Sequence, residues 1–387
     1  MRRCDELGRV SDEPGRLTRT FHSPAMARAN ALVGGWMRDA GLEVREDEAF
    51  NLLGRWPCAT NPRAKTLLLG SHLDTVRDAG KYDGPLGVLA ALAAVTALRE
   101  EGAKLPFAVE VVGFSDEEGV RYQSTYLGSG ALAGTLTKRD LALIEEKGIE
   151  RARRKRGELL GYAEVHIEQG PVLEASNLAL GVVGGITGWT RVRVEFTGRA
   201  GHAGTTPMAL RKDALCAAAE WIIAVEKHAR DGGVQVATVG QIDAQPGAGN
   251  VIPGHTKLSL DVRDFSDTKR CRALDEFQNL AMTIAKKRGV QTGWTLMQDS
   301  AALDFGGPVF DRMREAVRRH EPDAPSLPSG AGHDAAAMAA VCPAAMMFVR
   351  CKGGVSHHPA ESVKTADVAK AVAALHDFVL GLAEKHR

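Results

Sequence analysis

Histidines and carboxylates of this chain gather where apolar, strand-like segments end or a helix begins. The set comprises His72, Asp83, Glu117, Glu118, His166 and one of the neighbouring pair His357 and His358. An open α/β sheet places its ligands beyond the carboxyl ends of its strands. A mixed imidazole and carboxylate set suits Zn²⁺ or Mn²⁺, and an aspartate can bridge two ions. Taken singly, each position predicts little, because Asp83 before Gly84 could simply cap a helix.

The segment FSDEEGVR (114–121) raises an electrostatic question. Asp116, Glu117 and Glu118 follow the apolar run FAVEVVG without a nearby basic residue until Arg121. Adjacent carboxylates at the end of a buried strand repel one another and are costly to desolvate, so either water or a positive group must stabilise them. Metal ions would supply that charge. We expect Asp116 to face solvent or to cap the following turn.

The segment LLLGSHLDT places Asp74 two residues after His72. If the strand continued, both side chains would share a face, so Asp74 could orient the imidazole or act as a ligand itself. Neither a compact HExxH, a GxSxG nor a Walker-type loop is present, and VGGITG matches a dinucleotide fingerprint poorly. The ligands must therefore be brought together by the fold.

The elements that would position these residues alternate along the first part of the chain. A capped helix begins near Ser23, and further segments follow: strands at 65–70, 107–114 and 162–170, with a helix at 87–102. Strands alternating with helices predict an α/β architecture with a mainly parallel sheet. The charge run at 145–159 mixes glutamates with basic residues and predicts a solvated helix.

The middle of the chain has a different order. Strand-like and helical segments follow one another as β-α-β-β-α-β, at 189–198, 209–228, 234–243, 255–264, 267–288 and 293–300. This is the ferredoxin-like split unit, which is complete in itself. We therefore predict an inserted domain over 187–302. The α/β pattern resumes afterwards, so the first domain is discontinuous, over 1–186 and 303–387.

Bulk composition excludes several classes of partner. A net charge of +1 over 387 residues gives no electrostatic reason to expect nucleic acid as a partner. The sequence contains no run of 18 apolar residues, so it predicts no membrane span. The N-terminus lacks the apolar core of a secretory signal, and the six cysteines are scattered, which favours reduced thiols. We expect a cytoplasmic protein without nucleic-acid or membrane partners.

Nine motifs occur in an order that resembles a known family. They are GSHLDT, YDGPLG, SDEEGVR, HIEQGPVLE, GRAGHAGTTPM, GNVIPG, DVR, SGAGHDAA and SHHPAE. The chain resembles the hydantoinase/carbamoylase branch of the metal-dependent aminoacylase/carboxypeptidase superfamily, the M20-type peptidases, from EPGRLTRTF to SHHPAES. The resemblance implies a binuclear-metal catalytic domain with a phosphorylase/hydrolase-like fold over 1–186 and 303–387. It implies that 187–302 is a lid and dimerisation domain.

The resemblance also implies roles for single residues. Two divalent ions would bind each subunit, Zn²⁺ or Mn²⁺ with Co²⁺ or Ni²⁺ also possible. The ligands would be His72, Asp83 and His166 for one ion, and Asp83, Glu118 and His357 for the other. Glu117 would be the general base, and Asp74 would orient His72. The implied substrate contacts are Gln169, His202, Asn250, Arg263, Gly330 and Gly332.

In function, the resemblance implies an amidohydrolase that cleaves a ureido C–N bond of a small carboxylate. We favour allantoate, converted to ureidoglycine or ureidoglycolate with ammonia and CO₂, because YDGPLG and EGVRYQSTYLGS resemble allantoate amidohydrolases. The alternatives are an N-carbamoyl-L-amino-acid hydrolase, a dipeptidase or aminoacylase, and a degenerate member that binds metal without turnover. His202 would stabilise the oxyanion across a homodimer interface, and Arg263 would hold the carboxylate. Without the resemblance, His202 would be a loop residue and Arg263 an exposed strand charge.

Overall fold

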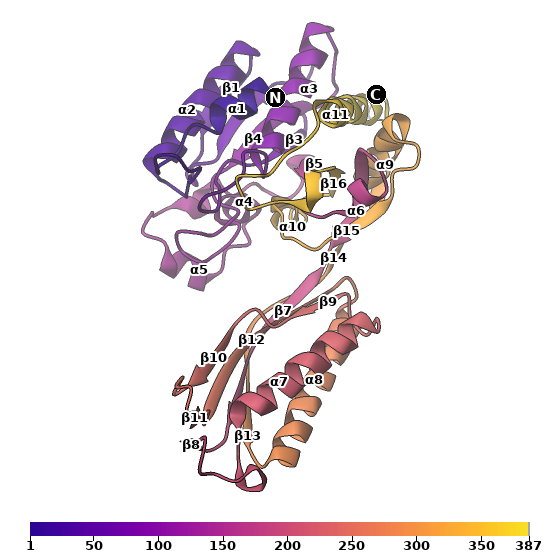
Figure 1. The fold of residues 1–387 in the computed structure, drawn as a ribbon. Helices are drawn as coiled ribbons and strands as arrows, with labels where there is room; N and C mark the ends of the chain where they lie inside the picture. The colour runs from indigo at the N-terminus through magenta and orange to yellow at the C-terminus, as the bar shows by residue number, and fades with distance from the viewer. Residues whose placement is uncertain (386–387) are drawn as a thin grey trace. The chain divides into compact units, whose positions relative to one another are not determined.

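The computed structural model describes residues 1–385 and divides the chain into two compact units (Figure 1). One unit is formed by Met1–Gly184 together with Phe305–Arg387, and the other by Gly185–Asp304. Each unit has a sheet and a hydrophobic core of its own. The chain therefore leaves the first unit, builds the second, and returns.

The first unit is built on a mixed sheet with the strand order β1-β2-β4-β3-β5-β16-β6, with β15 paired to β6. The strands are β1 Glu43–Glu46, β2 Leu52–Trp56, β3 Thr66–His72, β4 Ala108–Phe114, β5 Leu159–Ile167, β6 Leu180–Ile186, β15 Ser326–Ser329 and β16 Ala344–Val349. β4, β3, β5 and β16 run parallel, whereas β1, β2 and β6 pair antiparallel. The four parallel strands are apolar and almost wholly buried, as strands covered on both faces must be. The expected α/β architecture is confirmed, and its parallel part is the centre of the sheet.

Helices cover the sheet and complete the core of this unit. They are α1 Arg2–Leu7, α2 Pro24–Asp39, α3 Pro85–Glu100, α4 Leu127–Ala133, α5 Lys138–Leu143, α6 Val172–Ala175, α9 Gly307–His320, α10 Asp334–Met338 and α11 Thr365–Lys385, with short 3₁₀ turns η1 Ile149–Ala152 and η3 Lys352–Gly354. α3 is apolar on nearly every side and packs between β3 and α11. Pro85 is the first residue of α3 and Gly84 is its N-cap, so the helix begins two residues after Asp83.

The second unit is an antiparallel sheet with two helices. Its elements are β7 Gly188–Thr197, β8 Gly201–His202, η2 Met208–Leu210, α7 Ala214–Arg230, β9 Val236–Thr238, β10 Ile242–Gln245, β11 Val251–Ile252, β12 His255–Asp264, α8 Asp267–Arg288, β13 Gln291–Ser300 and β14 Leu303–Asp304. The sheet order is β10-β12-β7-β13, with β9 also on β12, while β8 pairs with β11. Every second residue of β7 and β12 is buried, and these side chains pack with α7 and α8 in one core.

Two local expectations were wrong. The single strand expected at 234–243 is two strands, and the pairing with β12 shifts by one residue between Ala237–Val262 and Ile242–Leu258. The helix expected at 145–159 is also missing, because only η1 forms there. Gly148 and Gly157 adopt φ of 84° and 93°, which a helix cannot accommodate. Among residues 1–385, no helix is long and apolar enough to cross a membrane.

Candidate metal centre

The carboxyl ends of the central parallel strands carry the predicted ligands. His72 is the last residue of β3, His166 lies one residue before the end of β5, and Glu118 follows β4. His357 is in the loop after β16, and Asp83 lies two residues before α3. Because these strands are parallel, their carboxyl ends share one edge of the sheet. The fold therefore brings together residues as far apart in the sequence as His72 and His357, which are separated by 285 positions.

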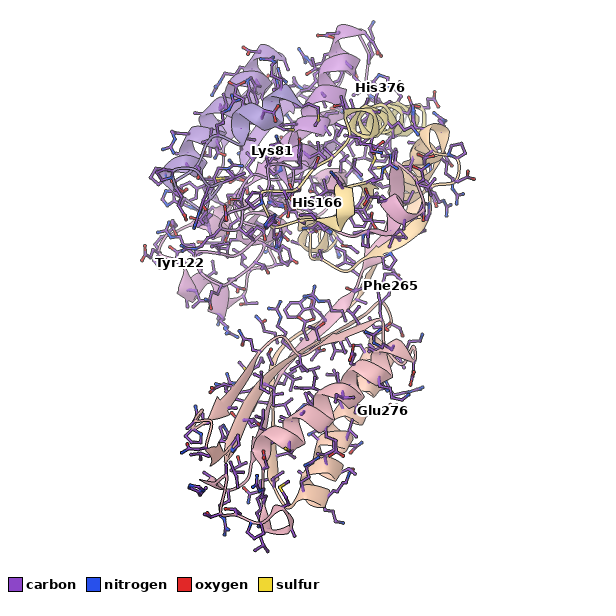
Figure 2. The ribbon with its side chains drawn as sticks, in the orientation of Figure 1. Lys81, Tyr122, His166, Phe265, Glu276 and His376 are labelled. Atoms are coloured by element: carbon purple, nitrogen blue, oxygen red, sulfur yellow. The ribbon has the colours of Figure 1, made fainter. Side chains whose placement is uncertain are left out.

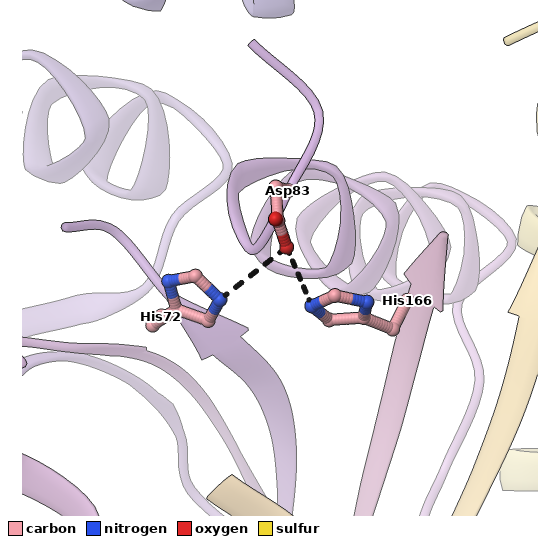
Figure 3. Close-up of side chains that lie close together, drawn as sticks. All are labelled: His72, Asp83 and His166. Atoms are coloured by element: carbon pink, nitrogen blue, oxygen red, sulfur yellow. Dashed lines mark ion pairs between the residues drawn. The ribbon is translucent and has the colours of Figure 1, made fainter. Parts of the chain in front are cut away.

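His72, Asp83 and His166 form the first group of candidate ligands (Figure 3). Asp83 Oδ1 lies 3.8 Å from His72 Nε2 and 3.1 Å from His166 Nε2. Two bonds of about 2.1 Å at a tetrahedral angle would place ligand atoms about 3.4 Å apart, so this spacing fits one shared ion. Figure 2 shows His166 in the interior of the first unit, and all three side chains are buried.

The outer nitrogens of both histidines are already engaged. His72 Nδ1 lies 3.1 Å from the backbone carbonyl of Asp74, and His166 Nδ1 lies 2.9 Å from that of Ile167. A carbonyl only accepts, so each Nδ1 carries a proton and each Nε2 faces Asp83. With Nδ1 engaged in this way, Nε2 is the nitrogen that could bind an ion after losing its own proton.

Asp83, Glu118 and His357 form the second group. His357 Nε2 lies 3.2 Å from Asp83 Oδ2 and 3.4 Å from Glu118 Oε1. The two oxygens of Asp83 thus face different groups, which is the arrangement of a bridging carboxylate. His358 is exposed, and its Nδ1 accepts the N–H of Ala360 instead.

The charges of the two groups influence one another strongly. Burial disfavours the charged imidazolium of His72, yet Asp74, Glu117 and Asp83 together hold its pKa well above the usual value. Burial likewise opposes ionisation of Asp83, but hydrogen bonds from His166 and His357 keep its pKa well below the usual range. The hydrogen bond to Asp83 raises the pKa of His357 to about 9. The site therefore favours positive charge, and divalent cations are well suited to it.

The three carboxylates of FSDEEGVR occupy different surroundings. Glu117 is only 8% exposed, and burial together with the charge of Glu118 raises its pKa well above the usual value. Burial and then the charge of Asp83 raise the pKa of Glu118 to about 7. One carboxylate atom of Glu117 lies within 4.8 Å of ligand atoms of both His72 and Glu118.

Asp116 does not face solvent, which was the first of its two expected placements. Its side chain is 0% exposed, and the backbone N–H of Gly119 in the following turn lies near its carboxylate. Burial and then the charge of Asp74 raise its pKa well above the usual range. The physical reason is the start of α4, whose Leu127 N–H donates to the carbonyl of Asp116 at 2.8 Å and closes the chain over it.

Asp74 is placed between His72 and the two glutamates. Its carboxylate accepts the backbone N–H groups of Glu117 at 3.0 Å and Glu118 at 3.2 Å, and Oδ1 lies 3.4 Å from His72 Nδ1. Asp74 therefore positions the backbone of Glu117 and Glu118 as well as the imidazole of His72.

Of the predicted substrate contacts in the first unit, Gln169 lies beside the metal groups. Its Nε2 donates to Asp83 Oδ2 at 2.9 Å and to Ser356 Oγ at 3.1 Å. Gly330 and Gly332 lie in the turn between β15 and α10. A Cβ added to Gly332 would lie 1.7 Å from the hydroxyl oxygen of Tyr126, so a larger residue there would require the Tyr126 side chain to move.

The second unit carries the other three predicted contacts. His202 is exposed on β8, and its Nδ1 accepts the N–H of Gly204 at 3.0 Å. Asn250 lies next to it, because its carbonyl accepts the N–H of Ala203 at 2.9 Å. Arg263 is on β12, where its Nε and Nη2 donate to Asp261 at 2.8 and 3.1 Å. The guanidinium fork expected for a substrate carboxylate is thus already paired with a carboxylate.

Sequence reasoning missed Glu361. Its Oε1 accepts the backbone N–H of Tyr82 at 2.7 Å and of Asp83 at 3.0 Å, so it fixes the loop that carries the shared ligand. Ser356 Oγ donates to Asp83 Oδ2 at 2.7 Å and lies 3.4 Å from Glu361 Oε2. The only signal in the sequence was the position of Glu361 within SHHPAE.

Glu164 and His333 were also missed. The carboxylate of Glu164 accepts hydrogen bonds from Ser71 Oγ at 2.6 Å and from the backbone N–H of Ala335 at 3.0 Å. The ring of His333 meets that of His166 edge-on, with centroids 4.4 Å apart. Together with His166 they form a further set of atoms close enough to hold an ion. A glutamate inside a buried strand, two residues before His166, was the available signal.

The chain is similar to known proteins over most of its length. The family model described as "Peptidase family M20/M25/M40" matches residues 68–381. An "Allantoate deiminase 2" of Glycine max is 40% identical over 98% of the chain and 88% of its own length. An "N-carbamoyl-L-amino acid amidohydrolase" of Geobacillus stearothermophilus is 41% identical over 99% of the chain and 97% of its own. The crystal structure of a hydantoinase/carbamoylase family amidase from Burkholderia ambifaria is 32% identical, with a TM-score of 0.89 over 99% of the chain and 96% of that structure.

Proposed function

Because the chain belongs to peptidase family M20/M25/M40, in its hydantoinase/carbamoylase branch, we propose that it is a binuclear-metal amidohydrolase. Its reaction would be hydrolysis of the ureido C–N bond of a small carboxylate. The observation that carries the proposal is Asp83, whose two oxygens face two separate groups of candidate ligands. Glu117 lies beside both groups without being needed to complete either one.

The ions would lower the pKa of a bound water and polarise the ureido carbonyl. Glu117 would take a proton from that water and deliver it to the leaving nitrogen. Its burial raises its pKa well above the usual value, which favours a carboxyl group that can hold the proton before passing it on. Asp74 would keep Glu117 in place through the backbone bond to its N–H.

We propose the second unit as the lid and dimerisation domain, over 187–302. The order β7-α7-β9/β10-β12-α8-β13 supports a ferredoxin-like unit in which one edge strand is split in two. His202 on this unit would donate a hydrogen bond to the oxyanion in the site of a second subunit. The homodimer and the cytoplasmic location both belong to this proposal.

Allantoate is the substrate we favour, and an N-carbamoyl-L-amino acid is the alternative. The relatives named for the two activities are 40% and 41% identical to the chain, so overall similarity does not choose between them. The preference rests on YDGPLG and EGVRYQSTYLGS. Both substrates carry a carboxylate, which the guanidinium of Arg263 could bind with two hydrogen bonds. The substrate would then replace Asp261 as the partner of Arg263.

Release of ammonia from allantoate, compared with turnover of several N-carbamoyl-L-amino acids, tests the proposal. The metal-free protein is reconstituted with Mn²⁺ or Zn²⁺, and Glu117→Gln is the matched control. We expect metal-dependent turnover that is fastest with allantoate and that Glu117→Gln abolishes. Turnover of carbamoyl amino acids alone would select the alternative. Metal binding without turnover of either class would refute an amidohydrolase and leave a metal-binding protein.

A further inference from the structure

We propose that Arg19, in the N-terminal segment EPGRLTRTF, is a positioning residue for the candidate metal centre. It would hold Asp74 in place and, through Asp74, the backbone of Glu117 and Glu118. The catalytic part of this inference rests on the proposed function, whereas its effect on metal binding does not.

Arg19 fastens both chain neighbours of Asp74. Its backbone N–H donates to Thr75 Oγ1 at 2.9 Å, and its carbonyl accepts the N–H of Thr75 at 2.8 Å. Its Nε donates to the carbonyl of Leu73 at 2.6 Å. Leu73 and Thr75 are thus held by the side chain and the backbone of Arg19. This restricts the direction in which the carboxylate of Asp74, between them, can point.

The same segment runs along the connection from His72 to Asp83. The N–H of Asp78 donates to Thr18 Oγ1 at 3.1 Å, and the N–H of Ala79 donates to the carbonyl of Leu17 at 2.8 Å. Leu17, Thr18 and Arg19 are all buried. The N-terminal segment therefore braces the loop that begins and ends with candidate ligands.

The side chain uses the particular shape of arginine. Besides Nε, its Nη1 donates to the carbonyls of Leu7 at 3.1 Å and Val10 at 3.0 Å, at the end of α1. Three carbonyls are thus bound in directions fixed by one planar guanidinium, which a lysine ammonium cannot reproduce. Nη2 is buried without a hydrogen-bond partner among the described residues.

Arg19 also contributes charge in a region crowded with carboxylates. Its side chain is 0% exposed, and burial lowers its pKa to about 10, an effect that the charge of Asp74 opposes. It therefore stays protonated at neutral pH. A buried cation is stable only beside a compensating anion, and a buried anion only beside a compensating cation. Arg19 and Asp74 would stabilise each other, while Asp74 accepts the amides of Glu117 and Glu118.

The test compares Arg19→Met with a matched control, Arg350→Met. Arg350 belongs to the same unit and makes a largely buried, two-pronged pair with Asp367 at 2.9 and 3.0 Å. Affinity for Zn²⁺ is measured by competition with a chelator, and unfolding by urea. We expect both variants to lose stability. Only Arg19→Met should also lose metal affinity, by about 10- to 100-fold, the range seen when partners of ligands are removed.

A double-variant cycle shows whether Arg19 acts through Asp74. In an Asp74→Asn background, the effect of Arg19→Met on metal affinity should fall to less than half of its size in the native background, on a logarithmic scale. If Arg19→Met does not fold, Arg19→Lys takes its place in the same cycle, because it keeps the charge and one donor. Additive effects, or an Arg19 variant with native metal affinity, would overturn the proposal.

The outcome is separable from that of the proposed function. If the native protein binds Zn²⁺ but hydrolyses neither substrate class, the amidohydrolase proposal fails while the cycle on metal affinity still decides the role of Arg19. If turnover is found, kcat should fall in Arg19→Met at saturating metal with KM changed less than threefold, because Glu117 is displaced and the substrate contacts are not. An effect on KM alone would contradict a positioning role.

Discussion

Replacing Glu361 by alanine should weaken metal binding although Glu361 is not a candidate ligand. Its Oε1 accepts the N–H groups of Tyr82 and Asp83, and its side chain is 4% exposed. Without the carboxylate, the loop that carries Asp83 loses its anchor. Since Asp83 faces both groups of ligands, a shift of this loop would disturb both.

The size of the effect on stability follows from the two amides. A buried donor left without its partner costs about 1 to 3 kcal/mol, so two such donors would cost about 2 to 6 kcal/mol. Glu361 also lines an open pocket of about 620 Å³, together with residues such as Pro359 and Gly80. Water can therefore enter the vacated space and satisfy part of the loss. We expect Glu361→Ala to lower the free energy of unfolding by about 2 to 4 kcal/mol.

The assay is urea unfolding of the metal-free protein, with Zn²⁺ affinity measured by chelator competition. Burial and the charge of Asp83 raise the pKa of Glu361 to about 7, so pH 8 keeps it mostly ionised. Glu361→Ala should bind Zn²⁺ about 10- to 100-fold more weakly. Glu361→Gln keeps an oxygen for both amides and should change affinity by less than about fivefold. Asp367→Ala should lose comparable stability with native affinity. If Glu361→Ala binds Zn²⁺ within twofold of the native protein, the anchoring role is wrong.

Three further changes probe other parts of the site. Glu117→Gln should lower kcat by about 10²- to 10⁴-fold while metal content per subunit, measured by elemental analysis, stays native; full activity would exclude Glu117 as the base. Arg263→Ala should raise KM for carboxylate substrates by about 10- to 100-fold, whereas Asp261→Ala should lower KM because it frees the guanidinium. An unchanged KM in Arg263→Ala would show that Arg263 does not bind the substrate carboxylate. Because the pKa of His357 is raised to about 9 by Asp83, this pair stabilises the metal-free protein fully below the ordinary histidine pKa and is lost as pH rises through 9. Metal must displace the same proton, so Zn²⁺ affinity should rise between pH 6 and 9 with proton release seen by calorimetry; a pH-independent affinity would contradict the His357–Asp83 pairing.

The elements that sequence patterns predicted well are those with clear ends and a clear period. The predicted bounds of β12 and α8 agree with the structure, because β12 alternates buried and exposed residues and α8 has Ser266 as its cap and Gly289 as its stop. β1, β2 and β6 were not predicted. β1 is a short and mostly exposed edge strand, and β6 contains three glycines in seven residues, so neither shows a period that signals a strand.

The candidate ligands could be found from sequence because histidines and carboxylates at strand ends are unusual. Their supporting residues could not be found in this way. Glu361, Glu164 and Arg19 each bind at least one backbone group that lies 54 to 279 residues away in the chain, and no local pattern records such a partner. Asp116 was expected to face solvent or to cap the following turn, and only the path of α4 over it shows that it is buried.

The position of β16 in the sheet determines when the first unit can be completed during synthesis. β16 lies between β5 and β6, yet Ala344–Val349 leaves the ribosome after all of Gly185–Asp304. The second unit has its own core and can fold first. Until β16 emerges, β5 and β6 each present an unpaired edge, which is a template for aggregation. Nascent chains that end before Ala344 should therefore engage chaperones or aggregate. His357 follows β16 in the chain, so the second group of candidate ligands would be among the last parts of the molecule to assemble.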